Sequence, residues 1–128
     1  MTTQKFYSDP EVLIQEMSSL HAEGDLVVEE IVRKMNELAV IEAELFEKYE
    51  REYINLKEQA NSEGLKMTEK ELEHRVNNLV LDLKIKQIVL ETQVEALLKK
   101  LKWIESKLSA IQTLLNYHEE VYRDLARY

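Results

Sequence analysis

The stretch Met67-Thr68-Glu69-Lys70-Glu71-Leu72 decides the fold, because it starts a segment that contains neither Gly nor Pro as far as the C-terminus. Thr68 and Glu71 have the spacing of a capping box, in which each side chain accepts a hydrogen bond from the other residue's backbone amide. Met67 and Leu72 are placed for the hydrophobic staple that often accompanies this box. A continuous helix of roughly 58 residues would be about 85 Å long, so it requires packing partners along its whole length.

Apolar residues recur along this segment in alternating steps of three and four, which is the spacing of a coiled-coil seam. The seam residues are Leu72, Val76, Leu79, Leu83, Val94, Leu97, Leu101, Ile104, Leu108, Ile111, Leu115, His118, Tyr122 and Leu125. Between Leu83 and Gln87 the register slips, a stutter that locally unwinds a left-handed supercoil. A two-stranded seam would leave Ile85, Ile88 or Val89 in water. We therefore expect at least three helices to meet there, from this chain or from neighbouring copies.

Two shorter helices are expected before this segment, over residues 10–23 and 26–62. Ser8-Asp9-Pro10 supplies a capping side chain and then a proline in the first turn, where its missing amide hydrogen costs nothing. Gly24 and Asp25 interrupt the apolar pattern, so the sequence predicts either a kink or a turn there.

Gly64 follows the second helix and suits the left-handed conformation that commonly ends a helix. Only a few residues separate it from Thr68, and short connections join antiparallel neighbours. The sequence therefore predicts an all-α fold: a long antiparallel helical hairpin (coiled coil) with a short N-terminal helix, in an oligomer. Residues 1–8 are expected to form a flexible tail and residues 9–128 a single domain, with the last helix at about 69–126. Helix 10–23 covers the end of that helix if the chain runs straight through Gly24; otherwise another subunit must do so.

The composition favours long helices and narrows the classes of partner. The chain is rich in Glu, Leu and Lys, and it has two Gly and one Pro. Its formal net charge of −8 opposes binding to nucleic acid and to acidic membranes. It has no Cys, which excludes disulfides and thiolate zinc sites. Neither a signal peptide nor a run of about 18 apolar residues is present, so we expect a cytoplasmic protein without a membrane partner, in the host cytoplasm if a phage encodes it.

The motifs of catalysis are missing from the sequence, which has no nucleophile motif, phosphate loop or His-Glu-x-x-His. Glu71 and His74 have the Glu-x-x-His spacing of di-iron helical bundles, but those sites need two such motifs and two more glutamates. We therefore expect no catalytic residues, no metal and no other cofactor, and we interpret the chain as not an enzyme. His118 lies on the seam, so its protonation below about pH 6.5 is expected to loosen the C-terminal end if it is buried.

Charge is distributed unevenly along the chain. Residues 25–63 carry eleven acidic and five basic residues, whereas residues 84–107 carry six lysines and three glutamates. The simplest explanation is that these lysines face the acidic helix of the same hairpin. A second explanation is a nucleic-acid site, because Trp103 lies beside the seam and can stack on a base while lysines hold phosphates. This candidate site consists of Lys99, Lys100, Lys102, Trp103 and Lys107. The alternative for Trp103 is packing against a third helix or a neighbouring subunit.

The seam and the region of the slip supply the candidate interface with other copies or partners. Its residues are Ile85, Ile88, Val89, Leu108, Ile111, Leu115, Tyr122 and Leu125. Near the C-terminus, tyrosines cluster with arginines: Tyr117, Tyr122 and Tyr128 with Arg123 and Arg127. This composition is favoured at interaction surfaces and equally ordinary at the end of a coiled coil.

The stretch Lys66-Met67-Thr68-Glu69-Lys70-Glu71-Leu72-Glu73-His74-Arg75-Val76 and the run that ends Leu108-Ser109-Ala110-Ile111-Gln112-Thr113-Leu114-Leu115 complete a layout of charged helix, short loop and long amphipathic helix. In this layout, over about residues 26–125, the chain resembles the small helical recombination-mediator (UvsY-type) proteins of T-even phages. The resemblance implies rings of subunits, binding of single-stranded DNA and help in loading a recombinase.

Two functions from different classes are consistent with the sequence. The first is a non-enzymatic, oligomeric coiled-coil protein that accompanies single-stranded DNA as an accessory of phage recombination or replication. The second is a protein-binding scaffold, adaptor or inhibitor that engages a basic partner through its acidic helical surface. The expected partners are other copies of the chain, a recombinase or another protein, and single-stranded DNA.

Overall fold

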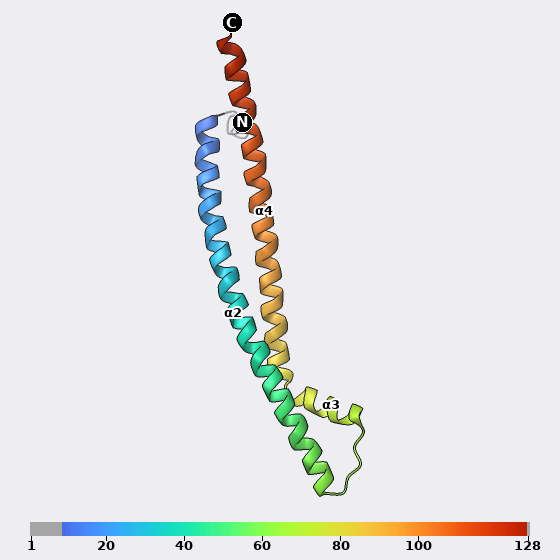
Figure 1. Cartoon of the computed structure of the whole chain (residues 1–128). Helices are drawn as coiled ribbons and strands as arrows, with labels where there is room; N and C mark the ends of the chain where they lie inside the picture. The colour runs from blue at the N-terminus through green and yellow to red at the C-terminus, as the bar shows by residue number, and fades with distance from the viewer. Residues whose placement is uncertain (1–8, 128) are drawn as a thin grey trace. The chain divides into compact units, whose positions relative to one another are not determined.

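The computed structural model describes residues 9–127, and three α-helices account for almost all of them. They are α2 (Pro10–Ser62), α3 (Glu69–Leu79) and α4 (Leu81–Ala126), and Figure 1 shows their order along the chain. The fold is therefore the predicted all-α helical hairpin. The predicted tail, residues 1–8, lies outside the described residues.

The start of α2 is the one that the sequence predicts. The backbone amide of Glu11 donates to Oδ1 of Asp9 over 3.0 Å, and the amide of Leu13 donates to the carbonyl of Asp9 over 3.1 Å. Pro10 is the first helical residue, where no intrahelical hydrogen bond needs its amide. Asp9 thus caps the helix with both its side chain and its carbonyl.

One continuous helix replaces the two that were predicted over residues 10–23 and 26–62. Of the two alternatives predicted at Gly24, the turn is absent, because α2 continues through this glycine, which does not adopt a positive φ. Instead it is buried in the helix, where it lies close to the side chain of Ile104. A glycine within a helix weakens it by about 1 kcal/mol, a cost that packing of the flanking apolar residues offsets.

The turn after α2 forms at Gly64, as predicted, with φ of 69°. The amide of Gly64 donates to the carbonyl of Asn61 over 3.3 Å, and that of Leu65 donates to the carbonyl of Ala60 over 2.9 Å. This pair of bonds is a Schellman motif, which satisfies carbonyls left open at a helix end. Thr68 then caps α3, since its side chain accepts from the amide of Glu71 over 3.2 Å.

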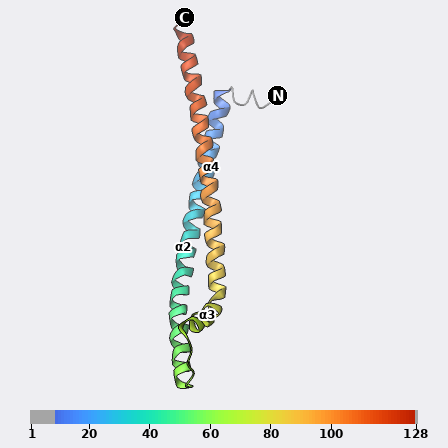
Figure 2. The ribbon, with the colours of Figure 1, turned by 90° about the vertical axis from the view of Figure 1, so that its right-hand side faces the viewer.

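The predicted helix over residues 69–126 is broken at Val80 into α3 and α4. Figures 1 and 2 show α3 turned across the axis of the first turns of α4. Val80 is buried, whereas Leu79, which was predicted on the seam, is half-exposed. Val80 and Leu90 are both buried in unit 2, and Lys84 spans the break with a 2.7 Å hydrogen bond from Nζ to Oδ1 of Asn77.

The chain divides into two compact units. Of the described residues, unit 1 comprises 9–31 and 96–127, and unit 2 comprises 32–95. The core of unit 1 consists of Leu13, Leu20, Val27, Ile31, Ile104 and Ile111. The buried apolar residues of unit 2 are Ala60, Leu72, Val76, Val80, Leu90 and Val94. The N-terminal residues of α2 thus cover the C-terminal part of α4, the first of the two arrangements that the sequence allowed.

The predicted seam of α4 is buried or half-buried from Val94 to His118. Its last two residues, Tyr122 and Leu125, are exposed. Figure 2 shows the reason within unit 1: the last turns of α4 extend beyond the start of α2.

Candidate interaction sites

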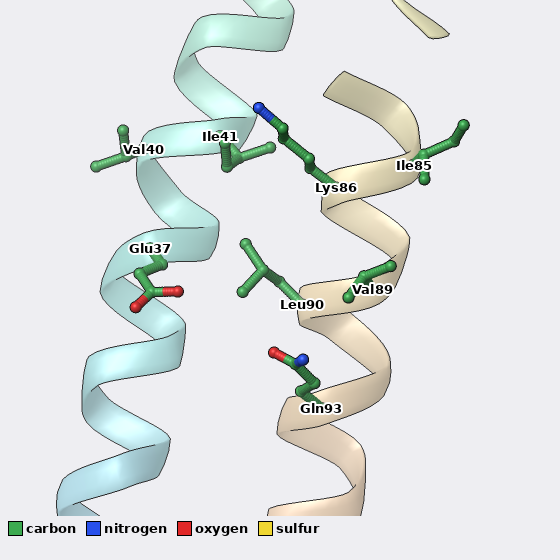
Figure 3. Close-up of a pocket in the computed structure, with 8 residues that line it drawn as sticks. All are labelled: Glu37, Val40, Ile41, Ile85, Lys86, Val89, Leu90 and Gln93. Carbon is green, nitrogen blue, oxygen red and sulfur yellow. The ribbon is translucent and has the colours of Figure 1, made fainter. Parts of the chain in front are cut away.

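Unit 2 contains an apolar groove of about 540 Å³ between α2 and α4. Its lining residues are Glu37, Val40, Ile41, Ile85, Lys86, Val89, Leu90 and Gln93. In Figure 3 the side chains of Ile41 and Leu90 point into the space between the two helices, and Ile85 lies at the outer edge of the groove, farther from α2. The groove is thus mainly apolar, with a few polar side chains at its rim, as is usual where a partner's apolar side chains bind.

The residues around the register slip are half-exposed in unit 2. Ile85, Ile88 and Val89 were predicted to require a third helix, and each of them leaves about half of its side chain in water. Leu81, one turn before Ile85, is equally exposed. These neighbours form a continuous apolar surface on α4, which two helices alone do not bury.

The remaining candidate interface residues lie in two different environments in unit 1. Ile111 is buried in the core, and Leu108 and Leu115 pack against that core. These three residues therefore contact the chain's own N-terminal helix. Tyr122 and Leu125, in contrast, are largely exposed and remain accessible to a partner.

The lysines near Trp103 form ion pairs with the N-terminal part of α2. Lys100 Nζ lies 3.4 Å from Oε1 of Glu23, and Lys107 Nζ lies 3.7 Å from Oε1 of Glu16. Lys107 Nζ also lies 4.5 Å from the centroid of the Trp103 ring, a cation–π contact. The lysines thus face glutamates of the same hairpin, although these glutamates precede the predicted acidic segment 25–63.

Three members of the candidate nucleic-acid site point to solvent. Lys99 and Lys102 are exposed, and Trp103 is 52% exposed. Lys100 is exposed as well and Lys107 is half-buried, and these two lysines differ from the other candidates in that glutamates partly neutralise their charges.

An acidic stretch at the start of α2, which the sequence pattern did not single out, supplies the two glutamates that pair with these lysines. Residues 9–31 contain seven acidic side chains and no lysine or arginine. They are Asp9, Glu11, Glu16, Glu23, Asp25, Glu29 and Glu30. One of its oxygens, Oε2 of Glu16, is buried without a hydrogen-bond partner among the described residues.

A second apolar stripe on α2 was also overlooked. The exposed residues Val32, Met35, Ala39, Ala43 and Phe46 follow one another in steps of three and four. On the hairpin side of α2 the structure half-buries Leu38, Ile41 and Leu45, whereas Met35 and Glu42 are exposed. The hairpin seam therefore runs through Ile41, and the stripe lies on a neighbouring face of the helix.

Tyr49 and Tyr53 stack along α2 in unit 2, with ring centroids 6.4 Å apart. Burial raises the pKa of the Tyr49 phenol, and the carboxylate of Glu73 on α3 raises it further. These contacts tie the middle of α2 to α3, so we interpret the pair as part of the packing of unit 2.

The described residues show neither a metal cluster nor a membrane span. In residues 9–127 no group of three His, Asp or Glu side chains is arranged to hold a metal ion, Glu71 and His74 included. Nor does any helix in this range have an apolar stretch long enough to cross a membrane. His118 is half-buried and makes an edge-on contact with Tyr117, with ring centroids 6.2 Å apart.

Comparison with known proteins adds no relative to this description. No family model, no curated protein and no solved structure matches the chain.

Proposed function

We propose that this protein acts by binding and assembly, as a non-enzymatic helical hairpin whose unit 2 receives an apolar helix from another copy or another protein. The observation that supports the proposal is the groove lined by Val40, Ile41, Val89 and Leu90 together with the exposed apolar surface of α4. An elongated groove between two helices suits a third helix, which presents apolar side chains at regular intervals along one face.

The gain from covering this surface is large enough for specific binding. Burying an isoleucine or valine side chain completely contributes about 1.5–3 kcal/mol, so removing the exposed halves of Ile85, Ile88 and Val89 from water contributes about 1 kcal/mol each. The partly filled groove and Leu81 add to this amount. A bound helix would also complete the three-helix arrangement that the sequence predicts at this position.

The biological role that we propose is that of an accessory in phage recombination or replication. The support is the resemblance of layout to recombination-mediator proteins, which form rings and bring a recombinase to single-stranded DNA. In this role the apolar surface of unit 2 would join subunits or hold the recombinase.

The experiment compares Ile85→Glu with Ile54→Glu. Both isoleucines are 51% exposed in unit 2, but only Ile85 lines the groove. Light scattering coupled to gel filtration should show that Ile85→Glu lowers the mass of the assembly, whereas Ile54→Glu retains the wild-type mass. If the wild type assembles and Ile85→Glu assembles equally well, the groove is not the binding surface.

A second candidate function, binding of single-stranded DNA, is favoured by one observation. Trp103 is half-exposed beside the exposed Lys99 and Lys102, so a base could stack on the ring while the lysines hold phosphates. Fluorescence anisotropy with labelled oligo-dT at low salt tests this function, because phosphate contacts are strongest there. Binding that Trp103→Ala abolishes would support it, and absence of binding by the wild type at low salt would exclude it.

A further inference from the structure

The exposed stripe on α2 has the properties of a coiled-coil seam that is not occupied within the chain. Val32 and Met35 are each 53% exposed and Phe46 is 71% exposed, and the two alanines between them are exposed as well. At about 100° per residue, the five side chains lie within an arc of about 80° around the helix. Five neighbouring apolar positions within so narrow an arc are typical of a face that packs against another helix.

The five positions of this stripe are spaced symmetrically about Ala39. Met35 and Ala43 lie four residues to either side of it, and Val32 and Phe46 lie seven residues to either side. We propose that α2 pairs with α2 of a second copy, antiparallel, around a two-fold axis at Ala39. The proposal rests on the assembly role proposed above, but it concerns a different face of unit 2.

The side chains fit this pairing by size. The two-fold axis places Met35 opposite Ala43 of the second copy, and Val32 opposite its Phe46, so each larger side chain meets a smaller one. At the axis Ala39 meets its own counterpart, and small residues allow two helices to approach closely. A contact of this kind uses the same patch on both copies and closes after two subunits.

The charges beside the stripe also suit an antiparallel pair. Arg33 and Glu47 lie on the same edge of the stripe and are exposed. In an antiparallel pair, residues on the same edge of the two helices face each other, so Arg33 of each copy lies near Glu47 of the other. In a parallel pair, residues on the same edge of the two helices lie on opposite sides of the interface, so Arg33 of one copy would not meet Glu47 of the other.

Engineered cysteines test the pairing directly, because the chain has no cysteine of its own. A disulfide forms when two Cα atoms lie about 4.4–6.8 Å apart. Ala39→Cys places one thiol from each copy at the two-fold axis, so mild oxidation should move most of the protein to the dimer band of a non-reducing gel. Ala43→Cys is the matched control, since its two copies lie about 12 Å apart along the antiparallel helices.

A mixture of two single variants adds a second test of direction. Met35→Cys and Ala43→Cys face each other across the proposed pair, so the two proteins mixed together should give a dimer that neither gives alone. Both positions are exposed, and circular dichroism should show unchanged helix content. Cross-linking of Ala43→Cys alone, or an Ala39→Cys protein that stays monomeric on the gel, would overturn the proposal.

The groove and the stripe can be separated in the same experiment. Ile85→Glu in the Ala39→Cys background should leave the disulfide dimer unchanged, because Ile85 does not belong to the stripe. If Ala39→Cys fails to cross-link while wild-type assembly still depends on Ile85, the pairing at Ala39 is wrong and the proposed function stands. If Ala39→Cys cross-links while Ile85→Glu has no effect on the assembled mass, the pairing stands and the role of the groove is wrong.

Discussion

Gly24 packs against Ile104, and a Cβ atom on Gly24 would lie 3.6 Å from Cγ2 of Ile104, which is ordinary van der Waals contact. The glycine therefore leaves room for a methyl group, and its position in the middle of α2 does not require its conformational freedom. We expect Gly24→Ala to raise the free energy of unfolding by about 0.5–1 kcal/mol. Thermal and urea unfolding followed by circular dichroism would measure the change.

Gly64→Ala is the control for this prediction. Gly64 has φ of 69°, a conformation that costs a residue with a Cβ atom about 1–2 kcal/mol. The two substitutions should therefore change stability in opposite directions. A loss of stability in Gly24→Ala would show that the helix is strained or bent at residue 24.

Ile104 should contribute more to the stability of unit 1 than any exposed isoleucine. It is 1% exposed and belongs to the core cluster with Leu13 and Leu20. Ile104→Ala leaves a cavity and should lower the free energy of unfolding by about 2–5 kcal/mol. Ile14→Ala removes the same atoms from a side chain that is 56% exposed in the same unit, so its effect should stay within about 0.5 kcal/mol. Equal losses for the two variants would contradict the packing of α2 on α4.

The local signals in the sequence were sufficient to predict where the chain turns. Asp9, Thr68 and Gly64 each satisfy backbone groups within a few residues, so their roles depend on the neighbouring sequence alone. The seam of α4 was predictable for a related reason, since regular apolar spacing fixes which face of a helix is buried.

The features that were missed depend on packing between distant segments. The helix breaks at Val80 although neither Gly nor Pro lies near this residue, and the burial of Val80 depends on contacts within unit 2 that the local sequence does not show. The continuity of α2 through Gly24 was missed for a similar reason, since this glycine packs against Ile104, a residue distant in the sequence. On α2, Met35 and Ile41 are both apolar, so spacing alone could not decide which of them faces α4.

Lys107 should control the fluorescence of Trp103, which is the only tryptophan of the chain. Its ammonium group lies 4.5 Å from the ring centroid. We expect Lys107→Ala to reduce quenching of Trp103 by iodide, because a nearby positive charge attracts the anion. Stability should change by less than about 1 kcal/mol, as is usual for exposed ion pairs. Lys100→Ala is the control, because it also loses an ion pair with a glutamate. If quenching by iodide fell equally in both variants, the contact between Lys107 and the Trp103 ring would not be what controls it.

Tyr49 should make unit 2 less stable at alkaline pH. Burial, and then the carboxylate of Glu73, raise the pKa of this phenol above its usual value. The phenol of the unfolded chain has a pKa of about 10, so at higher pH the unfolded chain releases its proton while the folded chain still retains it. The contribution of Tyr49 to stability is therefore fully present below about pH 9 and is lost as pH rises through the folded pKa. Tyr49→Phe removes this contribution, so the loss of stability between about pH 8 and pH 11 should be smaller than in the wild type.

Urea unfolding at both pH values provides the measurement, and Tyr117→Phe, which removes an exposed phenol from unit 1, controls for the loss of one hydroxyl. Identical alkaline losses in Tyr49→Phe and the wild type would mean that the pKa of Tyr49 is not raised in the folded chain.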